Sequence, residues 1–434
     1  MNTTATSPSR PRRVLLITYD FPPSGGSGVQ RPTKMAKYLP RYGWEPIVLT
    51  TKHGRAVAHD HTLVKDVEHV RVHRVTAPNP YDWLLRFKKI FGRSSSPTSH
   101  ITAIPSAKRL SLRGLLIPDA KVFWLPFATR WAKRVAPSER CDVVLSTIPT
   151  PTAAMIGWRI AKRWGVPHVI DYRDPWHGAF FFPKRPKLLS RLEYALEQAI
   201  VSSAAAVISV QEDHANEMKE RTSNRIPVHL IHNGYDEADF DGVTPRSFSR
   251  LTIAHTGILY NARGALPIVI AIEKLVSEGA IDRDRIEFLQ VGPTDAEVAE
   301  HLDRLRRTIR VTVSGSVEHG QAISIMMGAQ VLYLPTLENA ITGKVFEYLR
   351  ACRPILAVGR SATNLNAVLA TAGRPEAHDP EDIDGIKSAL LAALTFRGRI
   401  EVTADVGAFS RQNQAAQVAE VLDESAGRHF SKIK

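Results

Sequence analysis

Short apolar runs alternate with segments of helical periodicity along most of this 434-residue chain. In the first half, the apolar runs predicted to form strands begin at Arg13, Glu45, Cys141, Val166, Ala205 and Val228. Between the first two runs, Val29, Pro32, Met35 and Leu39 recur at helical spacing, and Gly43 is a suitable helix stop. Strands that alternate with helices in this way are typical of a parallel α/β architecture.

The pattern is interrupted after His232 by a segment with little periodicity. Residues 233–250 are rich in Gly, Asp, Pro and Ser, which predicts an interdomain linker over 236–250. A second series of strand-like runs begins at Leu251, Ile286, Ile309, Ala329 and Arg353. We therefore expect a disordered tail over 1–12 and two Rossmann-like, doubly wound domains over 13–235 and 251–405. Sheets of this kind bind ligands in the crevice at the carboxyl ends of their strands.

The charge of the chain is strongly basic and unevenly distributed. The formal net charge is +14, and between Tyr81 and Val135 eleven Lys or Arg stand against two Asp, interleaved with bulky aromatics. This mixture suits the interface of an anionic membrane, but a solvated helical face that covers a core would have the same pattern. Residues 94–111, in the same segment, are the best candidate for a mobile loop.

The remaining composition is that of a globular protein in a reducing compartment. The two cysteines, Cys141 and Cys352, lie far apart, which argues against a disulfide framework or a cysteine metal site. No signal-peptide pattern and no run of about 20 apolar residues is present. We therefore expect a cytoplasmic protein, with peripheral attachment to the inner face of the cytoplasmic membrane if the basic segment binds lipid.

The first candidate binding element is the glycine loop FPPSGGSG, which lies between the first strand and the first helix. Gly25 and Gly26 allow the backbone to turn sharply and to approach a ligand closely, and the following helix N-terminus favours an anion. The loop lacks the G-x-G-x-x-G spacing that a dinucleotide-binding oxidoreductase would need. A plain strand-to-helix turn is the alternative interpretation.

A second candidate, DYRDPWH, follows the strand that ends near Tyr172. Arg173 can hold a carboxylate or phosphate in a bidentate manner. Asp174 or His177 could accept or orient the proton of an acceptor hydroxyl. A structural ion pair with a helix cap would explain the same residues.

Two further elements occur in the second half, each at a strand-to-helix turn. In HTGILYNARG, Gly257 forms the turn, and Arg263 is placed to face a diphosphate, although a surface arginine has the same pattern. In LENAITGKVFEYL, the loop with Thr342 and Gly343 leads into a helix. Lys344 and the helix N-terminus together suit a diphosphate. Glu347 suits the diol of a ribose, or only complements the helix dipole.

These motifs, in this order, resemble those of the family 4 retaining glycosyltransferases, which have the GT-B fold of two Rossmann-like domains facing across a cleft. The resemblance implies that Glu347 binds the nucleotide ribose, because it matches the later glutamate of the family's Glu-x7-Glu pair. The earlier glutamate has no direct match: Asn339 stands eight residues before Glu347, and Glu338 stands nine residues before it.

The resemblance also implies roles for the remaining site residues. Arg263 and Lys344 would neutralise the donor diphosphate, and backbone near Val317 would contact the base. No metal or other cofactor is implied, because the nucleoside diphosphate sugar is a co-substrate, the family needs no metal for sugar transfer, and no His/Cys spacing for a metal occurs. The last helix, within 409–434, would pack back on the N-terminal domain.

The sequence therefore predicts transfer of a sugar from a nucleoside diphosphate sugar to an acceptor hydroxyl with retention. The expected partners are this donor, a sugar or lipid-linked acceptor of a surface polysaccharide or glycolipid pathway, and an anionic membrane surface. The alternative from the same fold is a sugar epimerase or a nucleotide-sugar-binding protein. Nucleic-acid binding is disfavoured because no zinc finger, RNP sequence or helix-turn-helix pattern occurs.

Overall fold

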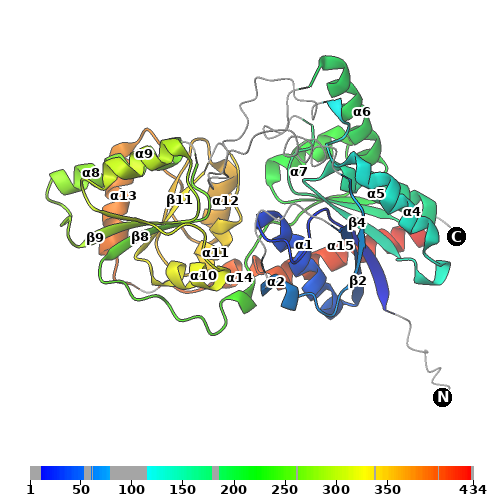
Figure 1. Ribbon diagram of the computed structural model, residues 1–434, viewed down its shortest axis with the longest axis horizontal. Helices are drawn as coiled ribbons and strands as arrows, with labels where there is room; N and C mark the ends of the chain where they lie inside the picture. The colour runs from blue at the N-terminus through cyan, green and yellow to red at the C-terminus, as the bar shows by residue number, and fades with distance from the viewer. Residues whose placement is uncertain are drawn as a thin grey trace, which may run out of the picture. The chain divides into compact units, whose positions relative to one another are not determined.

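The computed structural model describes residues 11–52, 60, 62–78, 115–177, 185–260, 262–336, 339–398 and 400–431. The chain forms two compact units (Figure 1). Unit 1 contains the described residues up to His232 and the C-terminal helix, and unit 2 contains Asn233–Ser410. The mobile loop expected at 94–111 and the tail residues 1–10 lie outside the described residues.

Unit 1 is built on a parallel sheet of seven strands with the order β3-β2-β1-β4-β5-β6-β7. The strands are β1 (Arg12–Ile17), β2 (Trp44–Thr51), β3 (Arg71–Val75), β4 (Val143–Ile148), β5 (His168–Tyr172), β6 (Ala206–Ser209) and β7 (Val228–Leu230). The helices are α1 (Ser27–Tyr38), α2 (Thr62–Lys65), α4 (Leu125–Arg134), α5 (Pro151–Trp164), α6 (Lys187–Ser202), α7 (Glu212–Arg221) and α15 (Arg411–Ser431). Because β1 is internal and the chain winds outward from it on both sides, the sheet is doubly wound.

The alternation of side chains along the strands of unit 1 divides its core into two layers. Leu15 and Ile17 of β1 pack in the cluster that contains α4 and α5. Val14 and Leu16 pack in the cluster that contains α1 and α15. Both faces of the sheet are therefore covered by helices, as a parallel sheet requires.

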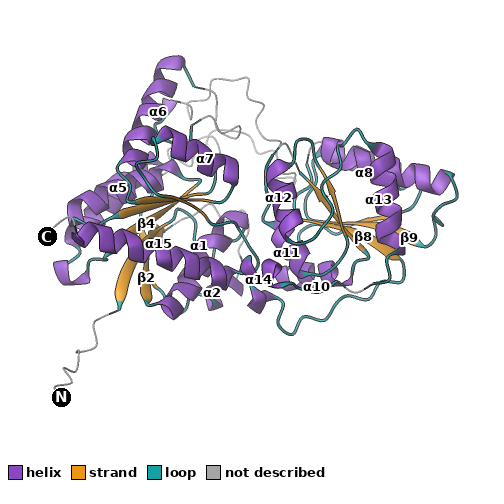
Figure 2. Cartoon of the chain, turned by 180° about the vertical axis from the view of Figure 1, so that it is seen from behind, coloured by secondary structure: helices purple, strands orange, loops and turns teal. Residues whose placement is uncertain are grey.

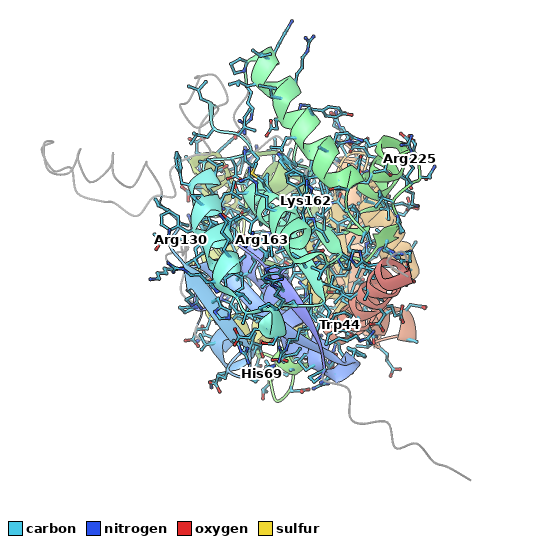
Figure 3. All side chains as sticks on the ribbon, turned by 90° about the vertical axis from the view of Figure 1, so that its right-hand side faces the viewer. Trp44, His69, Arg130, Lys162, Arg163 and Arg225 are labelled. Carbon is cyan, nitrogen blue, oxygen red and sulfur yellow. The ribbon has the colours of Figure 1, made fainter. Side chains whose placement is uncertain are left out.

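The C-terminal helix α15 belongs to unit 1 although it follows all of unit 2 in the chain. Its apolar side chains Val418, Val421 and Leu422 are buried against the first strand and helix of the unit. The indole Nε1 of Trp44 donates a hydrogen bond of 2.7 Å to Asp423, and Figure 3 shows Trp44 beside this helix.

Unit 2 is built on a parallel sheet of five strands with the order β10-β9-β8-β11-β12. The strands are β8 (Leu251–Thr256), β9 (Ile286–Val291), β10 (Arg310–Val313), β11 (Val331–Pro335) and β12 (Ile355–Val358). The helices are α8 (Ala262–Ser277), α9 (Ala296–Leu305), α10 (His319–Gly328), α11 (Lys344–Arg350), α12 (Thr363–Thr371), α13 (Ile383–Thr395) and α14 (Ala404–Ala408). Two layers cover this sheet: α8, α9 and α13 pack with Ile253, and α10, α11, α12 and α14 pack with Ala254 (Figure 2).

The segment expected to be a linker packs on unit 2. Tyr235 and Phe240 are buried in its core, and Glu237 forms an ion pair with Arg350 of α11, with Nε donating to Oε2 at 2.8 Å. The last residue of unit 1 before the chain enters unit 2 is His232. The aperiodic sequence after His232 thus includes residues that fold with the second sheet.

Candidate active site

The carboxyl end of β8 and the first turn of α11 come together in unit 2 around Lys344. Lys344 is the first residue of α11, and its Nζ lies 3.2 Å from Nε2 of His255 and 3.5 Å from the carbonyl of Ile258. The side chain passes over Gly257, where a Cβ would stand 2.3 Å from Lys344 Cε. Gly257 also has a φ of +104°, so both its conformation and the close approach require glycine.

The pKa of Lys344 lies close to neutral pH. Burial lowers this pKa to about 8, whereas the charge of Glu347 acts to raise it. The neighbouring His255 is fully buried, and burial followed by the charge of Lys344 lowers its pKa to about 3. At neutral pH the site therefore holds an ammonium beside a neutral imidazole, and an incoming anion would stabilise that ammonium.

Helix α11 is held firmly enough to place these groups. Val345, Phe346 and Leu349 are fully buried in the core of unit 2. The polar residues Lys344 and Glu347, three positions apart, lie on the same side of the helix. The loop before it is more open: the carbonyl of Thr342 accepts the N–H of Val345 at 3.2 Å, and Gly343 is exposed.

Glu347 is partly exposed, with 27% of its side chain accessible. Its Oε1 lies 3.8 Å from Nε2 of His319 on α10, and the same nitrogen lies 3.4 Å from Asp239. The carboxylate is thus accessible to a ligand diol while His319 limits its movement. Val317, expected near the base, is partly buried against the core of unit 2.

The side chain of Asn339 forms hydrogen bonds with the start of α12. Its Oδ1 accepts the backbone N–H of Asn364 at 2.8 Å and the hydroxyl of Thr363 at 2.9 Å. It therefore caps the first turn of α12, which its side chain reaches from the loop after β11. The side chains of two other expected site residues, Glu338 and Arg263, lie outside the described residues, although Arg263 itself is in the first turn of α8.

In unit 1, the residues after β5 are tied to the glycine loop. Arg173 donates a hydrogen bond of 2.8 Å to the carbonyl of Gly28. Gly26, which precedes α1, has a φ of +106°, and a Cβ added there would meet no atom within 4 Å. Gly25 precedes it in the same turn. Two motifs far apart in the sequence thus form one surface at the carboxyl edge of the unit 1 sheet.

Asp174 and His177 differ in their surroundings. Burial raises the pKa of Asp174, with Arg173 acting most strongly against that shift. His177 Nε2 lies 2.9 Å from Ser190 Oγ, and its ring packs edge-on against Tyr194 at 5.3 Å. His177 is thus held by α6, whereas no hydrogen bond or ion pair engages Asp174 within the described part of the chain.

Asp171, the first carboxylate of the same motif, is a core residue. It is fully buried, its Oδ1 lies 2.9 Å from NH2 of Arg31, and its Oδ2 accepts the hydroxyl of Thr147 at 2.8 Å. The alternative of a structural ion pair therefore holds for Asp171. Arg31 also donates to the carbonyl of His232 at 2.8 Å.

The sequence interpretation did not single out His255 or Gln290 as site residues. They lie at the ends of adjacent strands, 35 positions apart, and Nδ1 of His255 lies 2.7 Å from Oε1 of Gln290. No local spacing connects two strand ends this far apart. The only available signal was a polar residue at the carboxyl end of each apolar run.

One region of the chain is similar to a known protein family. Residues 90–239 match the model described as Glycosyltransferase Family 4, and no curated protein matches the chain. A Burkholderia xenovorans trehalose-phosphate synthase (UDP-forming), solved with glucose-6-phosphate, superposes with a TM-score of 0.60 at 14% identity, covering 95% of this chain and 100% of that one. The Anabaena protein HepE, solved with UDP and glucose, gives 0.52 at 14% identity and 97% and 99% coverage.

A third solved structure supports the same fold. The sucrose-phosphate synthase of Thermosynechococcus elongatus has a TM-score of 0.54 at 14% identity, covering 97% of this chain and 99% of that chain. The arrangement of two doubly wound parallel sheets expected from the sequence is thereby confirmed.

Proposed function

We propose, from the premise that this chain carries a glycosyltransferase family 4 domain and has the GT-B fold, that the site around Lys344 binds a nucleoside diphosphate sugar. The enzyme would transfer the sugar to an acceptor hydroxyl with retention of configuration. The observation that carries the proposal is the partly buried Lys344 ammonium at the carboxyl end of β8, whose Nζ lies beside a neutral imidazole and a carbonyl. Such a cation favours a diphosphate over any neutral ligand.

The chemistry follows from where charge develops. As the sugar departs, negative charge grows on the diphosphate, and a preformed cation stabilises it in the transition state more than in the ground state. Lys344 would supply this charge, and Arg263 would add a second cation. Glu347 would accept hydrogen bonds from the ribose hydroxyls. The loop of Thr342 and Gly343 would approach the phosphates or sugar.

On the acceptor side, Asp174 is the stronger candidate of the two predicted residues. It lies two residues after the end of β5, and its carboxyl group has a raised pKa, which suits a group that accepts a hydroxyl proton near neutral pH. His177 is engaged with Ser190 of α6, so we assign it to supporting the loop.

The test is a panel of UDP-, GDP- and ADP-hexoses. UDP-glucose comes first, because two of the solved neighbours were crystallised with UDP and glucose or with glucose-6-phosphate. A donor should raise the melting temperature by mass action and release nucleoside diphosphate with retained anomeric configuration, as seen by proton NMR. Stabilisation without any transfer or hydrolysis would favour the sugar epimerase or binding-protein alternative. Absence of both effects for all donors would contradict the proposal.

The acceptor is proposed to be presented at an anionic membrane surface, as a lipid-linked saccharide of a polysaccharide or glycolipid pathway. Most of the basic segment from Tyr81 lies outside the described residues, but its last part forms α4. Phe123, in the 3-10 turn just before α4, and Phe127, Arg130 and Arg134 of α4 follow one another at helical spacing, and all four are exposed. A face of aromatic and cationic side chains matches an interfacial helix.

Helix α5 extends this basic surface. It packs on α4, and Arg159, Lys162 and Arg163 are exposed on it. Figure 3 shows Arg130, Lys162 and Arg163 on the same side of unit 1. No helix among the described residues is long and apolar enough to cross a membrane, so binding would be peripheral.

Sedimentation with vesicles tests this surface. Binding to phosphatidylglycerol vesicles should exceed binding to phosphatidylcholine vesicles and should weaken as salt is raised. The double variant Arg130→Gln/Arg134→Gln should lose most of it, whereas Arg306→Gln on unit 2 should not. Equal binding to both lipids would remove the electrostatic argument.

A further inference from the structure

We propose that His255 is a positioning residue for the diphosphate site: as a neutral imidazole with its proton on Nδ1, it accepts a hydrogen bond from Lys344 and holds the ammonium over Gly257. This inference rests on the proposed function, because it assigns His255 a part in presenting Lys344 to the donor. His255 does not itself reach the reacting atoms.

The position of the imidazole proton follows from Gln290. The amide nitrogen of Gln290 donates to the carbonyl of Gly257 at 2.8 Å and to that of Gly292 at 3.2 Å. Because the nitrogen is committed to two carbonyls, the amide oxygen must be the atom that lies 2.7 Å from Nδ1 of His255. An oxygen can only accept, so Nδ1 carries the proton and Nε2 presents a lone pair. Lys344 Nζ lies 3.2 Å from that lone pair.

Burial and the neighbouring charge of Lys344 both favour the neutral form of the His255 imidazole. It is buried, with Nζ of Lys344 3.2 Å from its Nε2 and the ring centre of Tyr333 6.5 Å from its own. Protonation would place two adjacent cations in a buried space, which burial and charge repulsion both oppose. The charged group that faces Lys344 from its own helix is Glu347. His255 is therefore an acceptor at neutral pH.

Gln290 forms hydrogen bonds with two residues that contact the Lys344 side chain, Gly257 and His255. Its amide nitrogen fixes the carbonyl of Gly257, whose α-carbon lies under the lysine chain. Its amide oxygen fixes the tautomer of His255. A flexible lysine is thus oriented by a glycine below it and by an imidazole at its end. Such orientation before the donor binds reduces the entropy lost on binding.

The test compares two substitutions of His255. His255→Gln retains an acceptor close to the position of Nε2, whereas His255→Leu removes it. The primary readout is the reaction of the Lys344 amine with trace acetic anhydride between pH 6 and 10, measured by mass spectrometry of its peptide without any donor. An ammonium that loses a hydrogen-bond acceptor deprotonates more easily. His255→Leu should therefore move the labelling midpoint down by roughly half a pH unit or more, and His255→Gln should leave it near the wild-type value.

The second readout is kinetic and uses the best donor from the hexose panel. His255→Leu should lower kcat/KM by about tenfold and move its alkaline limb to lower pH, because one charge-assisted hydrogen bond to the catalytic cation is lost. His255→Gln should recover most of the activity. His168→Leu is the matched control: His168 is also fully buried with a pKa lowered to about 3, but it lies in unit 1 and should change neither readout.

A purely structural histidine would give a different result. In that case His255→Leu would lower the melting temperature and leave the labelling midpoint and the alkaline limb unchanged, which would overturn the proposal. If His255→Leu does not fold, Gln290→Met is the second test variant, because it keeps the imidazole but removes the acceptor that holds the proton on Nδ1. It should shift the midpoint in the same direction. Failure of the proposed function appears separately, as a wild-type protein without donor binding or transfer.

Discussion

The hydroxyl of Tyr348 accepts the backbone N–H of Thr256 at 2.9 Å, across 92 positions of sequence. Thr256 is the last residue of β8, and Tyr348 stands in the middle of α11. Tyr348 is fully buried, which raises its pKa to about 12, so the hydroxyl keeps its proton at physiological pH. This bond fixes the helix that carries Lys344 and Glu347 to the strand that ends at Gly257.

Tyr348→Phe should therefore affect stability and activity together. It leaves the buried N–H of Thr256 without its acceptor, which costs about 1–3 kcal/mol. We expect a lower midpoint of urea unfolding and a fall in kcat/KM of about tenfold, because α11 is less well placed. Unchanged kinetics in a destabilised variant would show that the bond serves the fold alone.

Substitution of Lys344 should separate activity from stability. Lys344→Ala should lower turnover by about 100-fold or more, on the scale of a lost electrostatic stabiliser. Lys344→Met should do the same but raise the free energy of unfolding at pH 7 by about 1–2 kcal/mol, because it removes a buried charge whose pKa is lowered.

The stabilisation by Lys344→Met has a defined pH dependence. The folded-state pKa of about 8 lies below the ordinary lysine value of 10.5. The cost of the buried ammonium is therefore full below pH 8 and vanishes towards pH 10.5. The gain in the variant should be largest in the acidic range, as measured by urea unfolding at several pH values. A loss of stability at pH 7 would argue that Lys344 is chiefly structural.

Arg263→Ala is predicted from the sequence to behave like Lys344→Ala in activity, with a fall in turnover of about 100-fold or more. Near-normal turnover in both alanine variants would refute the assignment of the two cations. Circular dichroism and the melting temperature of each variant show whether folding is intact.

Gly257→Ala should impair the site beyond the cost of its backbone strain. The new Cβ would stand 2.3 Å from Lys344 Cε, so the lysine must leave its place beside His255. We expect kcat/KM to fall by at least about tenfold and the labelling midpoint of Lys344 to rise towards that of an exposed lysine. Gly279→Ala, at a position with a φ of +70° and open space around its Cβ, controls for backbone strain.

Glu347→Gln should remove the preference of the enzyme for a nucleotide with a ribose over one with a 2′-deoxyribose. If the carboxylate accepts the 2′-hydroxyl, wild-type enzyme should bind UDP more tightly than 2′-deoxy-UDP by about 10–100-fold. In the variant this ratio should approach one, as isothermal titration calorimetry would show. A ratio that persists in Glu347→Gln would assign ribose recognition to another residue.

Two buried histidines make the fold sensitive to mild acid. The pKa values of His168 and His255 are lowered from 6.5 to about 3 by burial. Below pH 6.5 the unfolded chain binds protons that the folded chain does not, so stability falls as the pH decreases. One such histidine contributes about 2 kcal/mol to the loss between pH 7 and pH 5. His168→Gln should reduce the difference in unfolding free energy between these pH values.

The sequence by itself determined the two parallel α/β sheets, because the alternation of strand-like and helical patterns is local. The strands predicted from Arg13 and Leu251 correspond to β1 and β8. Gly43, with a left-handed φ of +80°, ends the 3-10 helix Leu39–Tyr42 that directly follows α1. The edge strand β3 escaped prediction. Its sequence RVHRV is only partly buried, so polar residues weaken the alternation that marks a strand.

Tertiary structure alone decided which of the polar residues act together. Lys344 and Tyr348 of α11, His255 of β8 and Gln290 of β9 come from three different elements, and their contacts form only when the strands take their order in the sheet. Likewise, Asp171 and Asp174 stand three residues apart, yet one is buried against Arg31 and the other has a raised pKa. Periodicity specifies which side of an element is buried. Burial depth and partner identity depend on the packing of distant segments, which no local pattern encodes.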